Sequence, residues 1–128
     1  MKGNTLVELS RTFAVDIVKQ CTAIEEKRRG NVLVNQLLRS GTSIGANIHE
    51  GNYASSKSDF INKFRIALKE CYETEYWLGL FKDVEYISTE QFDYLYSKSS
   101  KLRKLLIASI NTANANLQNP RKDNVPCP

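Results

Sequence analysis

Two pairs of acidic residues have a spacing that could hold a metal ion. Glu70 and Glu73 form an ExxE pair, and Glu90 and Asp93 form an ExxD pair. Clustered carboxylates of this kind can hold Mg²⁺ against a nucleoside triphosphate. In a helical hairpin that turns near residues 83–87, however, Glu70 and Glu90 would lie roughly 15 Å apart along the axis. The two pairs cannot then share a metal, and the second pair is better explained as acids in the first turn of a helix.

Other reactive side chains are few. His49 is the single histidine, which excludes multi-histidine metal sites and leaves few routes to acid–base catalysis near neutral pH. The cysteines at 21, 71 and 127 are far apart and lack CxxC spacing, so they indicate neither a zinc site nor a disulfide framework. Cys21 and Cys71 are predicted to be small buried hydrophobic side chains. We therefore expect no enzyme activity, no cofactor and no metal, and a reducing, cytoplasmic compartment.

Two clusters of basic residues could contact the phosphates of a nucleic acid. The loop cluster consists of Lys27, Arg28 and Arg29. The helix cluster consists of Lys98, Lys101, Arg103 and Lys104. Lys98, Lys101 and Lys104 step by three residues and so form a band on one side of a helix. Tyr94 and Tyr96 lie a turn earlier and could stack on bases or pack on the core. The alternative is that the loop cluster complements a helix dipole and the helix cluster is an ordinary solvated face.

Helices must position these residues, because apolar residues recur at helical spacing over nearly the whole chain. All three prolines fall after residue 119, and no strand alternation competes with the helical pattern. The pattern predicts helices over residues 4–27, 31–51, 56–82 and 88–117. Ser88 and Gln91 have the spacing of a capping box, and Ser56 with Asp59 has a weaker version of it. Gly51 is predicted to be the left-handed residue that ends the second helix.

Four helices joined by short loops predict an all-α fold, an antiparallel up-down-up-down four-helix bundle. Because 128 residues are enough for one core, residues 1–117 are predicted to form a single domain. The polar, proline-rich residues 118–128 are predicted to be a disordered tail. We expect no signal peptide and no membrane association, since the longest uncharged run, residues 105–119, is rich in Asn, Ser and Thr.

The second predicted helix is almost uncharged, although the chain as a whole carries a net charge of +4. Residues 31–54 contain only Arg39 and Glu50 as charged residues, whereas a surface helix of this length normally has several charges on its solvent face. In a lone four-helix bundle every helix keeps one solvent face. We therefore expect another subunit to cover this helix and the chain to form a homo-oligomer. The alternative is that a loop or the C-terminal tail covers it.

The same helix has a face of small residues and a polar face. Gly41 and Gly45 are four residues apart and would let a neighbouring backbone approach closely, which would offset the roughly 1 kcal/mol of helix propensity that each glycine costs. The candidate structural and interface motif consists of Arg39, Gly41, Ser43, Gly45, Asn47, Glu50, Gly51, Glu70, Glu73 and Trp77. We expect Arg39 and Asn47 to pair with carboxylates of this motif, within or between subunits, in a network that fixes helix register. The alternative is a ligand site.

These residues belong to longer stretches that resemble a known family. The most specific stretch is 36–51, and stretches 59–60, 66–70 and 73–78 follow at the expected distances. Over residues 5–115 the chain closely resembles the four-helix-bundle proteins encoded in intervening sequences of bacterial 23S ribosomal RNA genes. The same superfamily includes the accessory variability protein of diversity-generating retroelements.

This resemblance implies a ring-like homopentamer without known catalytic activity. For the retroelement branch it also implies binding to nucleic acid and to a reverse transcriptase through a basic surface. Our prediction is therefore a cytoplasmic, non-enzymatic oligomer that associates with RNA or DNA. The alternative is a protein-interaction scaffold, for example for a reverse transcriptase, with no direct role at nucleic acid.

Overall fold

The structure is a computed structural model that describes residues 2–118, with side chains from residue 5 onward. Within those residues it contains four helices and no strand, which confirms the all-α prediction. The helices are α1 (Lys2–Lys27), α2 (Val32–Asn52), α3 (Lys57–Asp83) and α4 (Thr89–Gln118). Each predicted helix agrees with these bounds to within two residues at either end. The predicted disordered tail lies outside the described residues, except for Gln118, which is helical.

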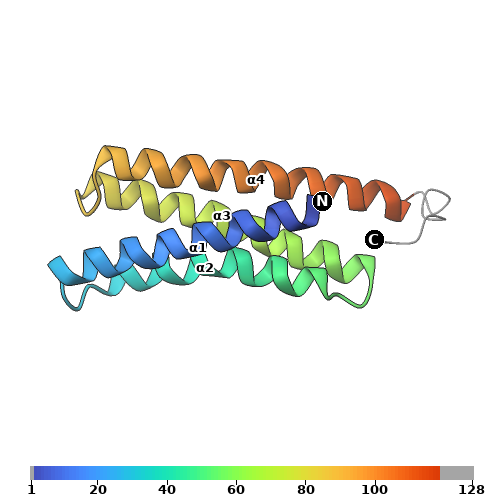
Figure 1. Cartoon of the computed structure of the whole chain (residues 1–128), viewed down its shortest axis with the longest axis horizontal. Coiled ribbons are helices and arrows are strands. Elements are labelled where there is room, and N and C mark those ends of the chain that lie inside the picture. The colour runs from blue at the N-terminus through green and yellow to red at the C-terminus, as the bar shows by residue number, and fades with distance from the viewer. Residues whose placement is uncertain (1, 119–128) are drawn as a thin grey trace.

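The helices lie side by side along the long axis of the molecule, and the connecting loops alternate between its two ends (Figure 1). Each helix packs on the next one in the chain. The contact between α1 and α4, which closes the bundle, is the least extensive of the four. The start of α1 and the end of α4 lie toward the same end of the molecule (Figure 1).

The core is a continuous stripe of apolar side chains from all four helices. Its largest fully buried members include Phe13, Ile17, Leu37, Ile44, Leu78, Phe81, Leu102 and Leu106. Each helix contributes two of these residues, spaced three, four or seven positions apart, as expected for helices that face a common interior. Burial of each such side chain stabilises the fold by about 1.5–3 kcal/mol relative to exposure. The core therefore fixes which face of each helix meets solvent.

Local side-chain hydrogen bonds set where three of the helices begin. The Ser88 hydroxyl accepts from the Gln91 backbone N–H at 3.0 Å, and the Gln91 side chain accepts from the Ser88 N–H at 2.8 Å. Ser56 accepts from the Asp59 N–H at 3.1 Å. Both predicted caps are thus confirmed. Asn31 caps α2 by accepting from the backbone N–H two residues later at 2.9 Å.

The prediction that Gly51 is a left-handed C-cap is wrong. Gly51 is a buried residue within α2, and the Tyr53 backbone N–H donates to the carbonyls of Gly51 and of the residue before it. A Cβ atom at Gly51 would lie 2.7 Å from the ring of Phe64. The position requires glycine because α2 and α3 approach each other closely there. A left-handed glycine is found instead at Gly30, in the α1–α2 loop, with a φ of 74°.

Candidate nucleic-acid interface

The helix cluster begins with a lysine that holds two helices together. Lys98 Nζ donates to Asp16 Oδ2 of α1 at 2.6 Å, and the Tyr94 hydroxyl donates to the same oxygen at 3.1 Å. The ammonium group also lies 4.5 Å from the centroid of the Tyr94 ring. The hydrogen bond to Asp16 raises the pKa of Lys98. Lys98 thus links α4 to α1. Because its charge is already compensated by Asp16, it is a poor ligand for phosphate.

Arg103 links α4 to α3 in the same way. Its Nε donates to Glu75 Oε2 at 3.0 Å, and the Ser99 hydroxyl donates to the same oxygen at 3.1 Å. Arg103 Nη2 also donates to the Ser100 hydroxyl at 3.0 Å. The side chains of Arg103 and Glu75 are only 21% and 11% exposed. Half of the predicted helix cluster is therefore used to join the helices.

The other half of the helix cluster is free. Lys101 and Lys104 are exposed and three residues apart on α4, so they lie on the same side of the helix. Neither forms an ion pair within the part of the chain that the structure describes. These two lysines are the members of the cluster whose charge can meet a phosphate group.

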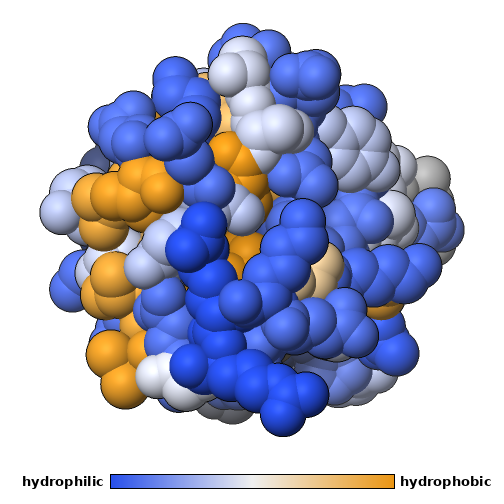
Figure 2. Space-filling model, turned by 90° about the vertical axis from the view of Figure 1, so that its left-hand side faces the viewer, coloured by the Kyte–Doolittle hydropathy of each residue, from blue (hydrophilic) through white to orange (hydrophobic). Residues whose placement is uncertain are grey.

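The loop cluster lies at the end of the molecule where α1 meets α2. The Arg28 guanidinium lies 4.5 Å from the centroid of the Tyr86 ring, and the Tyr86 hydroxyl accepts from the Asn31 amide at 2.7 Å. Lys27 and Arg29 are exposed and form no ion pair with residues 5–118. Figure 2 views this end and shows hydrophilic residues over most of it, with hydrophobic ones gathered mainly along one side. The cluster thus offers two free cations and one that stacks on an aromatic ring.

The candidate structural motif joins α2 to α3. Arg39 pairs through Nη1 with Glu70 Oε1 at 3.3 Å and through Nη2 with Glu73 Oε2. The Trp77 indole N–H donates to the same Glu73 oxygen at 3.1 Å. The expected pairing of Arg39 with these carboxylates is thus confirmed, and it occurs within one chain.

The remaining polar residues of α2 behave differently from one another. Glu50 accepts from Lys63 of α3 at 3.0 Å. Asn47 does not pair with a carboxylate of its own chain, because its amide donates to the Ser43 backbone carbonyl at 2.9 Å. Ser43 in turn donates to the carbonyl one turn before it, at 2.6 Å. Both charged residues of α2, Arg39 and Glu50, are therefore paired with α3.

The small residues of α2 pack against α1 of the same chain. A Cβ atom at Gly41 would lie 2.8 Å from Ile17 Cγ2, and one at Gly45 would lie 3.3 Å from the Ser10 hydroxyl oxygen. The prediction of close helix packing at these glycines is confirmed, and α1 is the neighbour. Ser40 faces the other way and accepts from the Thr74 hydroxyl of α3 at 3.0 Å.

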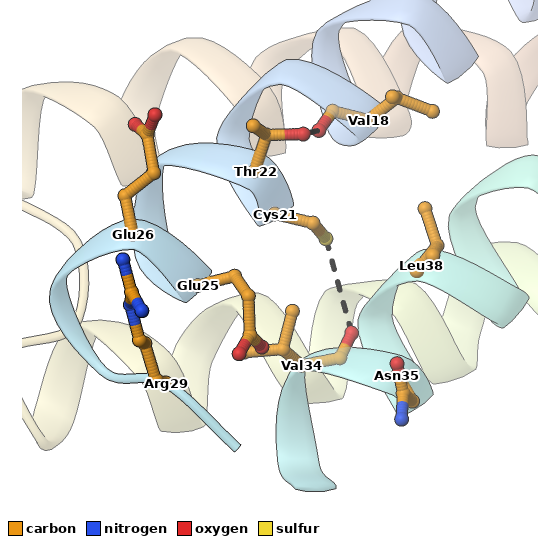
Figure 3. A pocket seen from close by; sticks show the side chains of 9 residues that line it. All are labelled: Val18, Cys21, Thr22, Glu25, Glu26, Arg29, Val34, Asn35 and Leu38. Carbon is orange, nitrogen blue, oxygen red and sulfur yellow. Dashed lines mark hydrogen bonds between the residues drawn. The ribbon is translucent and has the colours of Figure 1, made fainter. Parts of the chain in front are cut away.

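The two described cysteines are buried, as predicted. Burial raises the pKa of Cys21 and of Cys71 to about 12. The Cys21 thiol donates to the Val34 carbonyl at 3.8 Å, at the bottom of an open groove of about 510 Å³ between α1 and α2 (Figure 3). Since the thiolate is the nucleophilic form, neither side chain is suited to covalent chemistry near neutral pH.

The acidic pairs do not form a metal-binding cluster. Glu70 and Glu73 accept from Arg39, and Glu90 and Asp93 are exposed near the start of α4. Within the residues that the structure describes, no group of three or more His, Cys, Asp or Glu side chains could hold a metal ion. In the same part of the chain, no helix is long and apolar enough to span a membrane.

The structure also reveals a surface that the sequence interpretation did not single out. Arg65, Lys69, Tyr72 and Tyr76 are all exposed and share the outer face of α3. Their spacing of four, three and four residues is a signal that could have found them. It was missed because the basic residues of α3 are interspersed with acidic ones in the sequence, and only the fold shows that Glu70, Glu73 and Glu75 are paired with other helices.

The described residues define an all-α four-helix bundle in which ion pairs join the helices and a few exposed cations stay unpaired. Residues 2–108 match the family model of the 23S rRNA-intervening sequence protein. The chain therefore belongs to this family, as its resemblance over residues 36–51 predicted.

The chain is also similar to a crystal structure of a protein with unknown function from the S23 ribosomal protein family of Bacteroides thetaiotaomicron VPI-5482. The two sequences are 48% identical, and the match covers 87% of this chain and 99% of the other with a TM-score of 0.84. No curated protein matched the chain.

Proposed function

We propose that this chain is a non-enzymatic protein that binds nucleic acid as a homo-oligomer. The observation that carries the proposal is the division of its basic residues. Lys98 and Arg103 are each paired with an acid of a neighbouring helix, whereas Lys101 and Lys104 are exposed and form no ion pair with residues 5–118. Lysines that no acid neutralises can displace counterions from phosphates, and this exchange supplies most non-specific affinity for nucleic acid.

The outer face of α2 supports the homo-oligomer. The two charged residues of α2 pair with α3, so the helix carries no unpaired charge. Its other solvent-facing side chains are small or uncharged, among them Asn35, Leu38, Thr42 and Ala46. Val18 of α1, which is 44% exposed, lines the same groove as Asn35 and Leu38. A surface depleted in charge is typical of the centre of a protein interface. The occupant we propose is a second copy of this chain, in a ring-like homopentamer of antiparallel bundles, as the family resemblance implies.

A ring would repeat each basic cluster once per subunit. The net charge of +4 on one chain is modest, but charges repeated around a ring add to a field that attracts a polyanion over a longer range. Oligomerisation and nucleic-acid binding are therefore parts of one proposal, in which assembly strengthens binding.

The absence of enzyme activity is also part of the proposal. The acidic pair that has metal-ligand spacing in α3 is held by Arg39, and burial raises the pKa of both described thiols to about 12. These side chains are thus engaged in structure. Two buried cysteines without a disulfide also fit a reducing cytoplasm, which is the location we propose.

The test of nucleic-acid binding is the salt dependence of affinity in the Lys101→Gln/Lys104→Gln variant. We expect weaker binding, and a log Kd against log salt plot whose slope falls by about 0.7–0.9 for each lysine in contact with phosphate. Lys63→Gln is the matched control, because Lys63 is already paired with Glu50, and its slope should equal that of the wild type. Affinity that is insensitive to salt, or that survives the double substitution, contradicts the proposal.

Two further measurements test the assembly and the partner. Light scattering should give a multiple of the 14.6 kDa chain mass, and a monomer at micromolar concentration contradicts the oligomer. A pull-down should lose its partners after nuclease treatment. Partners that persist after nuclease, together with no affinity for RNA or DNA, would support a protein scaffold instead.

A further inference from the structure

A stripe of exposed side chains runs along the outer face of α3. Arg65, Lys69, Tyr72 and Tyr76, which we call the α3 stripe, recur at helical spacing and so lie on one side of the helix. Tyr72 is 52% exposed and Tyr76 is 64% exposed. Neither basic residue forms an ion pair within residues 5–118. The stripe thus combines two free cations with two aromatic rings that solvent can reach.

Residues of α4 extend this surface. The Arg103 guanidinium lies 5.9 Å from the centroid of the Tyr72 ring. Its hydrogen bond to Glu75 raises the pKa of Arg103. Tyr96 lies seven residues, about two turns, before Arg103 and so on the same side of α4. Tyr96 is 37% exposed, and its ring stacks on Phe92 with 5.2 Å between centroids. The tyrosines of the two helices therefore face one shared surface.

The fold itself does not require these tyrosines. The hydroxyls of Tyr72 and Tyr76 form no hydrogen bond with the described residues, and the core is built from Phe, Leu and Ile side chains. Two acids of α3 lie close in sequence to the stripe, and both are already bound: Glu75 to Arg103 and Ser99, and Glu73 to Arg39 and Trp77. Neither pairs with Arg65 or Lys69. Planar rings interleaved with unpaired cations match a ligand that has both flat aromatic groups and negative charges.

We propose that the α3 stripe, together with Tyr96, binds single-stranded nucleic acid. The tyrosine rings stack on bases, and Arg65 and Lys69 contact the phosphates. The inference rests on the proposed function and names its substrate class. Stacking of a base on an aromatic side chain contributes about 1–3 kcal/mol and tolerates any sequence. In a duplex the base faces are stacked on one another, so a duplex meets only the cations and binds more weakly.

The test compares a single strand with a duplex on the full-length protein. Fluorescence anisotropy uses a labelled oligouridine of about 20 nucleotides, which exceeds typical single-strand site sizes, and an RNA duplex of the same length at the same salt. We expect the oligouridine to bind about tenfold or more tightly than the duplex, since one stacked base accounts for such a factor.

Two variants locate the effect. Tyr72→Leu/Tyr76→Leu keeps apolar bulk but removes the rings, and it should weaken oligouridine binding about tenfold or more while duplex binding stays unchanged. The matched control is Tyr53→Leu, because Tyr53 is 79% exposed but follows the end of α2, outside the stripe. Circular dichroism and urea midpoints check that each variant folds. The exposed positions should change stability by no more than about 0.5 kcal/mol.

Trp77 provides a second readout. It is the single tryptophan of the chain, and its ring centroid lies 5.1 Å from that of Tyr76 in an edge-to-face arrangement. A base stacked on Tyr76 should therefore change the emission of Trp77. We expect this change when oligouridine is added to the wild type. A duplex at saturating concentration should leave the emission unchanged.

The outcomes separate this inference from the proposed function. Equal affinity for single strand and duplex, undiminished in Tyr72→Leu/Tyr76→Leu, overturns the inference and leaves the proposed function in place. Binding to neither RNA overturns the inference, and a lack of affinity for DNA as well overturns both. A loss of partner-protein binding in the tyrosine variant, with oligouridine binding intact, shows that the stripe binds protein and also overturns the inference.

Discussion

The outer surfaces of α2 and of α3–α4 use charge in opposite ways. On α2 both charged residues, Arg39 and Glu50, are paired with α3, so the helix carries no unpaired charge. On α3 and α4, exposed cations such as Lys69 and Lys101 have no acidic partner within residues 5–118, and Tyr72 and Tyr76 share the face of Lys69. The comparison teaches that pairing, rather than the number of charges, separates cations that join helices from cations that can bind a ligand.

The two surfaces also differ in how closely the chain packs beneath them. At Gly41 of α2, a Cβ atom would lie 2.8 Å from the buried Ile17, whereas at Gly79 of α3 it would meet nothing within 4 Å. Gly41→Ala should therefore destabilise the protein by about 1–3 kcal/mol through overpacking. Gly79→Ala should stabilise it by up to about 1 kcal/mol through helix propensity. Urea unfolding measures both.

These two alanine variants are matched controls for each other, since both replace a helical glycine by the same residue. Equal stabilities would contradict the close approach of α1 and α2. They would also remove the contrast between a tightly packed α2 and a solvent-facing outer side of α3.

The buried interior should have a pH signature. Burial raises the pKa of Cys71 from 9.0 to about 12. Between these values the unfolded chain loses a proton that the folded chain keeps, so the free energy of unfolding falls as pH rises. One such thiol contributes at most about 1.4 kcal/mol per pH unit. Urea unfolding measures the free energy of unfolding at pH 8 and at pH 10.5. The loss between these two pH values should be smaller in Cys71→Ala than in the wild type, and an equal loss would contradict the raised pKa.

The smallest expected effect compares a paired with an unpaired cation. Arg39→Met leaves Glu70 and Glu73 without their cation, and should destabilise the protein by about 1 kcal/mol, because Arg39 is itself half exposed and solvent screens the pair. Lys101→Met breaks no ion pair with the described residues and should change stability by less than about 0.5 kcal/mol. Thermal or urea unfolding of the two variants, made side by side, decides this. A larger loss of stability for Lys101→Met would reverse the comparison.

Features that depend on local sequence could be predicted well. Apolar spacing located the four helices, and Ser88 with Gln91 marked the start of α4, because capping involves residues only three apart. The close packing of another helix at Gly41 was also predicted from the spacing of the glycines, although the sequence did not show that this helix is α1.

Features that depend on the relative placement of helices could not be predicted. Lys98 binds Asp16, which is 82 residues away in the sequence, so its step of three residues from Lys101 suggested one continuous basic band. Gly51 followed the usual sequence pattern of a helix end, but glycine is needed there because the Phe64 ring of the next helix leaves no room for a Cβ atom. Tyr72 and Tyr76 have a visible spacing, yet only the fold shows that their face points to solvent.

The central claim is that unpaired cations bind nucleic acid while paired cations hold the bundle together. The most direct test measures the salt dependence of oligouridine affinity for Lys101→Gln/Lys104→Gln beside Arg39→Gln. The account predicts that the slope of log Kd against log salt falls in the lysine variant, by about 0.7–0.9 for each lysine that binds a phosphate in the wild type, and stays at the wild-type value in Arg39→Gln. Equal slopes in all three proteins, or a slope that falls only in Arg39→Gln, would contradict it.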